Sequence, residues 1–338
     1  MNKKPIAVII LNWNGVEMLR EFLPKVLAST DLSIADVIVA DNGSVDDSLS
    51  CLSSQFPEVG VIDLGKNYGY AEGYNRAIAT TGYLYTVLLN SDVATAEGWL
   101  PPLYRHMEDH PEVGACQPKI LSYDNPGQFE YAGACGGFID KNGFPYCRGR
   151  LFSTIENDNG QYDDIRPIFW ASGAALMVRS SLYTQVGGLD RDFFAHMEEI
   201  DLCWRIHLNG YHINVVPQSK VYHLGGGTLS ATNPRKTYLN FRNNLLLLHK
   251  NLPDHSRSRR LFIRRIYDTI AWFKFTLSFD FANANAIIKA HCDFRKMSKA
   301  YTSHPDRDLL LELQECRRNI IVEYYLMCRR TFNRLSEL

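Results

Sequence analysis

Apolar and polar residues alternate in blocks along the first hundred residues, and the blocks predict strands and helices in turn. Residues 6–12 (IAVIILN) form a continuous apolar run, which is typical of a strand covered on both faces. Similar runs follow at residues 36–41 and 85–90. Between them we predict helices over 16–28 and 46–55 and a short strand over 59–64. This β-α-β-α-β order predicts a parallel sheet with right-handed crossovers.

The rest of the chain divides into an irregular part, a second regular part and a helical tail. Residues 122–168 are rich in Gly, Asp, Asn and Pro, with a hairpin expected around residues 141–143. Further on we predict strands over 169–178, 211–217 and 220–222, an acidic helix from 198 that ends at Gly210, an amphipathic helix over 257–277 and a final helix over 308–334. We therefore predict an α/β domain over residues 1–250 and a helical C-terminal extension over residues 251–338.

Composition adds a charge asymmetry and a cellular compartment. The chain has 338 residues and 46% hydrophobic residues, enough to bury a full core. Residues 251–338 carry a net charge of +6 (16 Lys/Arg, 10 Asp/Glu), so the other residues carry −7. Eight scattered cysteines without a CxxC pair favour reduced thiols and a cytoplasmic location. No run approaches the ~18 uncharged apolar residues of a membrane span, and nucleic acid is disfavoured because the body is acidic.

Carboxylates stand at the ends of two predicted strands, where open α/β sheets build ligand sites. Asp41 either accepts the imide N–H of a uracil or thymine base or caps its own Asp-Asn-Gly-Ser turn. Together with the other polar strand ends, the base contact is favoured. Asn90 and Asp92 are spaced i and i+2, so both point to one side of an extended segment. Oxygen donors of this kind suit Mg²⁺ or Mn²⁺ shared with a diphosphate.

An acidic cluster and a lone histidine add the parts of a catalytic site. Glu198, Glu199 and Asp201 begin the acidic helix. Acids favour the first helical turn in any case, but three crowded carboxylates also raise one another's proton affinity, which suits a general base near neutral pH. His196 precedes them in an aromatic run that would line one side of a pocket. His223 follows a strand and is either a satisfied polar residue or a ligand of the same metal as Asp92.

Taken together, seven segments resemble the inverting family 2 glycosyltransferases of the GT-A fold, in the branch that includes bacterial rhamnosyltransferases of cell-surface polysaccharide assembly. The resemblance covers roughly residues 5–250 and follows the order of the family's motifs. The segments are ILNWNG, VADNGSVDDS, GKNYGYAEGYNRA, LLNSDV, WASGAALMVR, GGLDRDFFAHMEEIDLCWR and VYHLGG.

The resemblance implies a role for each matching position. Asp41 is similar to the base-binding acid, Asp92 to the metal ligand of a DxD-type element and His223 to the late histidine that completes a Mg²⁺ or Mn²⁺ site. Glu199 holds the position of the catalytic base, where the family has Asp, and Asn90 stands where the family has an acid. The other implied residues are Glu198 and Asp201 beside the base, Asn12, Asn14, Asn67, Asn75 and Asn90 at the donor, and Trp170, Ser172, Gly173 and His196 at the acceptor.

The implied activity is inverting transfer of a sugar from a UDP-, dTDP- or GDP-linked donor to a hydroxyl of a glycan or polyprenyl-linked acceptor. A sugar-nucleotide pyrophosphorylase would want a Gly-rich loop with Arg and Lys after the first strand, where this chain has residues 12–15 (NWNG). A non-catalytic carbohydrate-binding or scaffold protein with the same fold is the remaining alternative.

The tail leaves two interpretations open. Arg257, Arg259, Arg260, Arg264 and Arg265 share residues 257–277 with apolar Ile263, Ile266, Tyr267, Ile270, Phe273 and Leu277. A basic amphipathic helix of this kind can lie on an anionic membrane surface, here the inner face of the cell membrane. Alternatively, its apolar stripe packs on the catalytic domain or on a second subunit.

Overall fold

The computed structural model describes residues 4–225 and 233–335. Its contacts divide the chain into two compact units. The first unit comprises Met1–Gly137, Cys147–Phe194 and Glu198–Gly225, and the second comprises Phe138–Tyr146, Ala195–Met197 and Gly226–Leu338. In this division, the C-terminal segment of the second unit is counted from residue 226. The predicted domain boundary at residue 250 stays a prediction.

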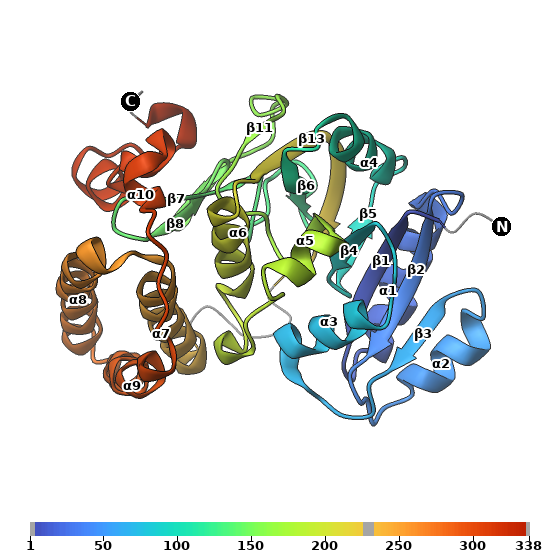
Figure 1. Ribbon diagram of the computed structural model, residues 1–338, viewed down its shortest axis with the longest axis horizontal. Coiled ribbons are helices and arrows are strands. Elements are labelled where there is room, and N and C mark those ends of the chain that lie inside the picture. Colours follow the sequence, from blue (N-terminus) through green and yellow to red (C-terminus); the bar gives the residue numbers. More distant parts are fainter. Residues whose placement is uncertain (1–3, 226–232, 336–338) are drawn as a thin grey trace. The chain divides into compact units, whose positions relative to one another are not determined.

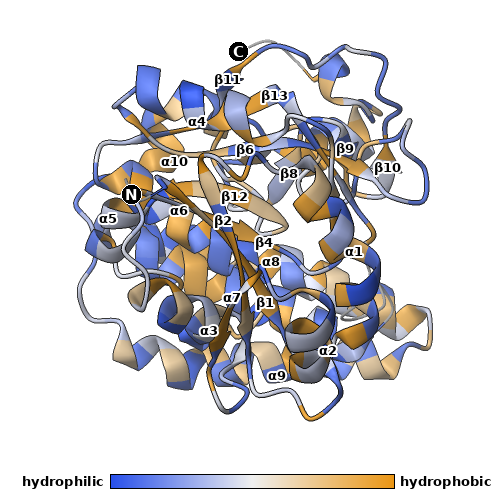
Figure 2. Ribbon diagram, turned by 90° about the vertical axis from the view of Figure 1, so that its right-hand side faces the viewer, coloured by the Kyte–Doolittle hydropathy of each residue, from blue (hydrophilic) through white to orange (hydrophobic). Residues whose placement is uncertain are grey.

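The N-terminal half of the first unit has the predicted parallel sheet. Strand β1 (Ile6–Asn12) lies between β2 (Ala35–Asp41) and β4 (Tyr85–Leu89), and β3 (Gly60–Asp63) extends the sheet beyond β2. All three pairings are parallel. Strands β1 and β4 are mainly apolar and buried because helices cover both of their faces, and β1 appears in the hydrophobic colour (Figure 2). Strand β3, at the edge of the sheet, is largely exposed. The parallel β-α-β prediction is confirmed.

The second half of the sheet contains both parallel and antiparallel strand pairs. The strand order across the whole sheet is β11-β13-β6-β12-β4-β1-β2-β3, and β5 (Val93–Thr95) pairs with β13. Strand β12 (Ala175–Arg179) runs antiparallel to both of its neighbours, and it starts six residues later than the strand predicted from residue 169. The two short strands predicted over 211–222 form one strand with a register shift after Val216. The remaining strands are β6 (Val113–Ser122), β11 (Arg166–Pro167) and β13 (His212–His223).

Side-chain alternation along β1 explains how the helices are placed. Ile6, Val8 and Ile10 join one core cluster with Leu19 of α1 and Leu103 of α4. On the other face, a Cβ at position 73 in α3 would lie 2.9 Å from Leu11, so this close approach requires glycine. The helices of this unit are α1 (Val16–Ser29), α2 (Ser48–Gln55), α3 (Gly69–Ala79), α4 (Leu100–Asp109), α5 (Ser180–Gln185) and α6 (Glu198–Leu208) (Figure 1).

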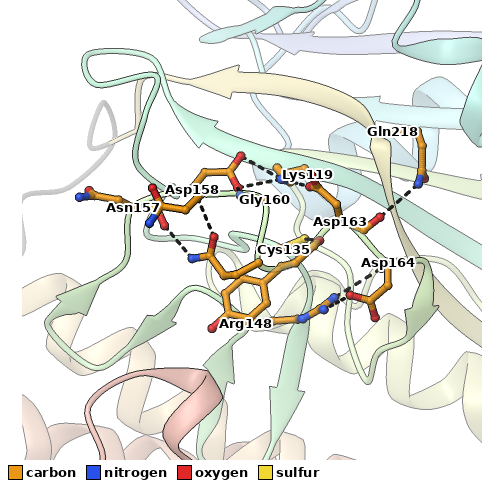
Figure 3. Close-up of polar contacts among 12 residues, drawn as sticks. Lys119, Cys135, Arg148, Asn157, Asp158, Gly160, Asp163, Asp164 and Gln218 are labelled. Carbon is orange, nitrogen blue, oxygen red and sulfur yellow. Dashed lines mark hydrogen bonds and ion pairs between the residues drawn. The ribbon is translucent and has the colours of Figure 1, made fainter.

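A buried lysine fixes the irregular segment of the first unit (Figure 3). The Lys119 side chain from β6 is fully buried, and its Nζ donates to both carboxylate oxygens of Asp158 at 2.9 and 2.8 Å and also to Asp163. Burial by itself would lower the pKa of Lys119, but the two carboxylates outweigh it and raise the pKa. Arg148 pairs with Asp164 beside it. The loop that contains Asp158, Asp163 and Asp164 is therefore held by ion pairs rather than by regular secondary structure.

We expect Lys119→Met to lower the free energy of unfolding by about 3–5 kcal/mol, because it leaves the largely buried Asp158 carboxylate without its cation. Urea denaturation of the purified variant measures this change. Lys296→Met is the matched control, since Lys296 is 78% exposed and 3.4 Å from Asp293. A pair of this kind contributes about 0–1 kcal/mol. Equal losses for the two variants would contradict the assignment.

The second unit is built around three long helices, α7 (Pro234–Asn251), α8 (Asp254–Leu277) and α9 (Phe281–Met297). The hairpin of β7 (Gly137–Ile139) and β8 (Pro145–Cys147) confirms the turn predicted around residues 141–143. The short strands β9 (Arg150–Leu151) and β10 (Thr154–Ile155) belong to the first unit and pair with each other antiparallel. Over residues 4–225 and 233–335, we find no helix with the length and apolarity to cross a bilayer.

The final helix predicted over 308–334 is wrong. Only α10 (Leu309–Glu312) is α-helical there, and short 3-10 and π turns follow it. Tertiary hydrogen bonds take backbone groups in this stretch: the N–H of Ile320 donates to Asp140 at 3.1 Å, and the carbonyl of Arg318 accepts from Lys141 at 3.1 Å. Contacts with the 138–146 hairpin therefore override the helical pattern of the tail.

Candidate active site

The carboxyl ends of β1 and β2 bring two predicted donor residues together. Asn12 and Asp41 are direct partners in the strand register, and Asn12 Nδ2 donates to Asp41 Oδ2 at 2.9 Å. Asp41 Oδ1 accepts from the Ser44 backbone N–H at 2.8 Å. Both side chains are fully buried. The turn alternative for Asp41 is therefore present in the structure, and its contact with a base stays a prediction.

The adjoining loops hold two further donor residues. Asn14 has a φ of +50°, a conformation that asparagine tolerates, and its Oδ1 accepts from the Val45 N–H at 2.8 Å. Asn67 Oδ1 accepts from Asn42 Nδ2 at 3.2 Å and from the Gly69 N–H at 2.8 Å. These bonds tie the loops after β1, β2 and β3 into one group at the carboxyl edge of the sheet.

Asn90, Asp92 and His223 converge although more than 130 residues separate the first from the last. His223 Nε2 lies 3.1 Å from Asp92 Oδ1 and 3.5 Å from Asn90 Nδ2. Glu130 Oε1 lies 3.5 Å from the other ring nitrogen of His223. Burial would lower the pKa of His223, but the carboxylates of Asp92 and Glu130 outweigh it and raise the pKa to about 10. The glycines at 226 and 227 that follow lie outside the described residues.

Asp92 and His223 form an ion pair in the structure, and a cation held between them stays a prediction. Ligands about 2.1 Å from an octahedral ion at right angles to each other lie about 3 Å apart, and the observed separation is 3.1 Å. Glu130 faces Nδ1, so Nε2 is the ring nitrogen left for a metal. Among residues 4–225 and 233–335, no group of three or more His, Cys, Asp or Glu side chains is arranged to hold a metal. Substrate phosphates and water would have to complete the coordination.

Tyr70 of α3 links this pair to the acidic helix. Its hydroxyl donates to the Gly173 carbonyl at 2.9 Å and lies 3.4 Å from Asn90 Oδ1. A Cβ at position 173 would in turn lie 3.8 Å from the Cβ of Glu199. Burial raises the pKa of Tyr70 well above its ordinary value, and the neighbouring acidic groups add to this effect. The chain thus brings five distant segments into one neighbourhood.

The two glutamates at the start of α6 differ in exposure. Glu198 is buried, and its Oε2 has no hydrogen-bond partner. Burial first, and then the charge of Glu199, raises the pKa of Glu198 well above its ordinary value, which favours the neutral form. Glu199 is partly buried, and its Oε2 is buried as well. Glu199 is thus the more exposed carboxylate of the two, and its role as the base stays a prediction.

Two predicted site residues have structural bonds instead. Asp201 is fully buried, and its Oδ2 lies 2.9 Å from Arg205 Nε and 2.7 Å from Nη2. The Asn75 amide donates to the Leu189 carbonyl at 2.8 Å and accepts from its N–H at 3.0 Å and from the Tyr183 hydroxyl at 2.6 Å. These bonds favour roles in holding the loop before α6, and neither a catalytic role for Asp201 nor a donor contact for Asn75 is tested.

The four predicted acceptor residues lie in different settings. Trp170 is buried against Gly137, where a Cβ would lie 2.1 Å from the indole ring. Ser172 is buried, and its N–H donates to Gln117 Oε1 at 2.8 Å. Gly173 adjoins Tyr70 and Glu199, as described above. His196 belongs to the second unit, where its φ is +69° and burial lowers its pKa to about 4. Of these, Gly173 is the residue found beside the acids.

Sequence reasoning missed two residues that hold the site together. Tyr70 stands in the glycine-punctuated loop after β3, where it reads as one of several tyrosines. Glu130 stands in the irregular 122–168 segment, where single acids are common. Glu130 contacts His223, 93 residues further along the chain, and Tyr70 contacts Gly173, 103 residues further. Local spacing in the sequence does not predict contacts at such separations.

Comparisons with known proteins agree with this arrangement. Residues 7–169 match the family described as Glycosyl transferase family 2. The chain is 27% identical over 232 residues to N-acetylglucosaminyl-diphospho-decaprenol L-rhamnosyltransferase of Mycobacterium tuberculosis, an overlap of 64% of this chain and 75% of that protein.

Two solved structures share the architecture. TarS of S. aureus in complex with UDP-GlcNAc has a TM-score of 0.57 at 16% identity, covering 86% of this chain and 80% of that one. The mannosyltransferase PcManGT of Pyrobaculum calidifontis in complex with GDP-Man and Mn²⁺ has a TM-score of 0.52 at 13% identity, covering 89% and 77%. At identities this low, the structural likeness shows the fold alone. It confirms the predicted GT-A-like α/β architecture with its helical C-terminal part. Residues 7–169 therefore form a family 2 glycosyltransferase domain, and the chain is a glycosyltransferase that resembles rhamnosyltransferases.

Proposed function

We propose that the protein is an inverting, metal-dependent enzyme that transfers a sugar from a nucleoside-diphosphate sugar to a hydroxyl of a lipid-linked glycan precursor. The observation that carries the proposal is the convergence of Asp92 and His223, 3.1 Å apart, with Tyr70 linking Asn90 to the segment beside Glu199. The site thus combines a cation-binding pair with a carboxylate base.

The donor would lie along the carboxyl edge of the sheet. Asp41 is the group proposed to accept the imide N–H of a uracil or thymine base, and Asn12 orients it through the 2.9 Å hydrogen bond. The nucleotide would be UDP, dTDP or GDP. Similar proteins support UDP and GDP, since the TarS structure contains UDP-GlcNAc and the PcManGT structure contains GDP-Man.

Asp92 and His223 would hold the Mg²⁺ or Mn²⁺ together with the donor diphosphate. When bound, the cation supplies neutralisation of the charge that develops on the leaving nucleoside diphosphate. Burial alone would raise the pKa of Asp92, but His223 outweighs that effect and lowers it, so the carboxylate is ionised. His223 would have to lose its proton before its ring nitrogen could hold the cation.

Glu199 is the proposed general base. It would accept the proton of the acceptor hydroxyl as that oxygen attacks the anomeric carbon from the side opposite the diphosphate, which inverts the configuration in a single displacement. The raised pKa of Glu198 favours its neutral form, so Glu199 is the proposed base of the pair. Tyr70 fixes the Gly173 carbonyl next to this base, so acceptor and base meet in a defined geometry.

The acceptor class is proposed from a relative. The Mycobacterium tuberculosis protein is named for transfer of L-rhamnose to N-acetylglucosaminyl-diphospho-decaprenol, a polyprenyl-linked sugar. We propose a polyprenyl-linked acceptor for this chain as well, with the enzyme working at the cytoplasmic face of the cell membrane.

Release of nucleoside diphosphate from a panel of nucleotide sugars, with Mn²⁺ and with a chelator, tests the proposed function. We expect turnover with one nucleotide class, dependence on Mn²⁺ or Mg²⁺, and a product of inverted anomeric configuration by NMR. Donor binding that occurs without transfer to any lipid-linked acceptor would support the carbohydrate-binding alternative. Undiminished turnover in chelator would contradict the metal-dependent mechanism.

Tyr70→Phe should lower kcat about tenfold, because the Gly173 carbonyl and Asn90 lose the hydroxyl that links them. Steady-state kinetics with the preferred donor would measure the loss. Tyr74→Phe is the control: it lies in the same helix, is more fully buried than Tyr70, and its hydroxyl donates at 2.9 Å to the Leu89 carbonyl. Both changes should cost about 1 kcal/mol of stability, but only the first should slow turnover. Parallel losses of kcat would mean that Tyr70 has a structural role alone.

A further inference from the structure

Helix α8 turns two of its arginines toward the interior of the second unit. Arg264 is buried, and its Nε donates to Asp268 Oδ1 at 2.6 Å. Asp268 also lies 2.9 Å from His291 Nε2 of α9. Arg260 is buried too, with Asp308 4.0 Å away. Two of the five arginines of this helix thus serve the interior of the second unit.

The outward face of α8 is apolar instead. Phe262, Ile266, Ile270, Phe273 and Leu277 recur every three or four residues, so they form one stripe along the helix. Their exposed fractions lie between 48% and 77%. A row of five large apolar side chains on one face exceeds the single exposed hydrophobics of an ordinary surface. We call these five residues the α8 stripe.

The turn after α8 continues this apolar surface. Phe279 is 82% exposed and has a φ of +59°, a left-handed conformation in which glycine is the usual residue. Phe281, also exposed, packs edge-on against it with ring centroids 6.3 Å apart. A bulky aromatic residue at such a position carries a backbone cost of about 1–2 kcal/mol. The strain favours a function for the exposed ring.

Helices α8 and α9 carry more exposed bases than exposed acids. Within residues 254–297, all of which the structure describes, the exposed acids amount to Asp254 alone, which pairs with Arg257 at 2.6 Å. The exposed bases of the same stretch are Arg259, Arg265, Lys274, Lys289, Arg295 and Lys296. The surface therefore combines protruding apolar side chains with positive charge.

We propose that the α8 stripe and the Phe279–Phe281 turn insert into the interface of an anionic lipid bilayer, with the surrounding lysines and arginines on the phosphate headgroups. An amphipathic surface with large apolar residues and a basic rim has this binding mode. A second copy of the chain fits less well, because a self-complementary interface would bring the same excess of positive charge together from both sides. The proposal is independent of the sugar transferred.

Vesicle flotation tests the surface without any measurement of catalysis. The full chain should float with vesicles of phosphatidylcholine and phosphatidylglycerol, bind pure phosphatidylcholine weakly, and dissociate as salt is raised. Leu277→Glu should lower the affinity for the anionic vesicles about tenfold, since it removes an inserted side chain and adds a repelled charge. The double change Arg265→Gln and Lys274→Gln should lower it by a similar factor, and only on the anionic vesicles.

Leu311→Glu is the matched control, because Leu311 is also an exposed leucine of the second unit but lies outside the stripe. It should leave vesicle binding unchanged, and circular dichroism should show that all variants are folded. Failure of the unmodified chain to float would overturn the proposal, as would equal losses for Leu277→Glu and Leu311→Glu. A dimer in solution that Leu277→Glu dissociates would assign the stripe to a second copy instead.

Discussion

Glu199→Gln should reduce kcat by about 10²–10⁴, because the amide cannot accept the proton of the acceptor hydroxyl. Glutamine keeps the size of the side chain, and no donor contact is assigned to Glu199, so the Kd for the nucleotide sugar should stay within about twofold of the original. Single-turnover transfer and isothermal titration with the donor would measure the two quantities separately. A large loss of rate with intact donor binding is the expected combination.

The neighbouring Glu198→Gln is the natural comparison. Burial raises the pKa of Glu198 well above its ordinary value, so its neutral form already resembles glutamine. This variant should lose much less activity than Glu199→Gln. Near-normal turnover of Glu199→Gln would show that the base lies elsewhere, with Glu198 and Asp201 the next residues to replace.

Asp92→Asn should abolish Mn²⁺-dependent donor binding. The change removes the negative charge opposite His223, 3.1 Å away, while keeping the shape of the side chain. Loss of an outer partner of a metal ligand typically costs about 10–100-fold in metal affinity, and loss of a direct ligand should exceed that. Titration of the donor with and without Mn²⁺, followed by thermal shift, measures the effect because ligand binding to the native state raises the Tm.

Asp109→Asn provides the control, since Asp109 is an exposed carboxylate at the end of α4. Its donor binding should remain dependent on Mn²⁺. If Asp92→Asn kept the same difference between Mn²⁺ and chelator as the unmodified chain, the proposed cation pair would be wrong.

Local pattern was sufficient to predict the elements that carry the site. The apolar run of β1, the polar ends at Asp41 and Asp92 and the acidic start of α6 are all visible as short-range alternation of residue types. The strand ends lie at one edge because parallel crossovers leave the carboxyl ends together. The fold class followed from these features, and the resemblance to the family placed His223 beside Asp92.

Only the tertiary structure decided which polar groups form hydrogen bonds and ion pairs with one another. Tyr70 and Glu130 entered the site, and Asn75 and Asp201 received structural bonds, through contacts that no spacing along the chain reveals. The predicted helix over 308–334 gave way because the 138–146 hairpin takes some of its backbone hydrogen bonds.

Helix α8 shows the same division most clearly. The sequence by itself determined that residues 257–277 form a helix with apolar and basic residues at regular spacing. Periodicity fixes the two faces of a helix but not which of them turns inward, because that depends on partners elsewhere in the chain. Asp268 and Asp308 pair with Arg264 and Arg260 in the interior, and this compensation of buried charge leaves the apolar stripe on the surface.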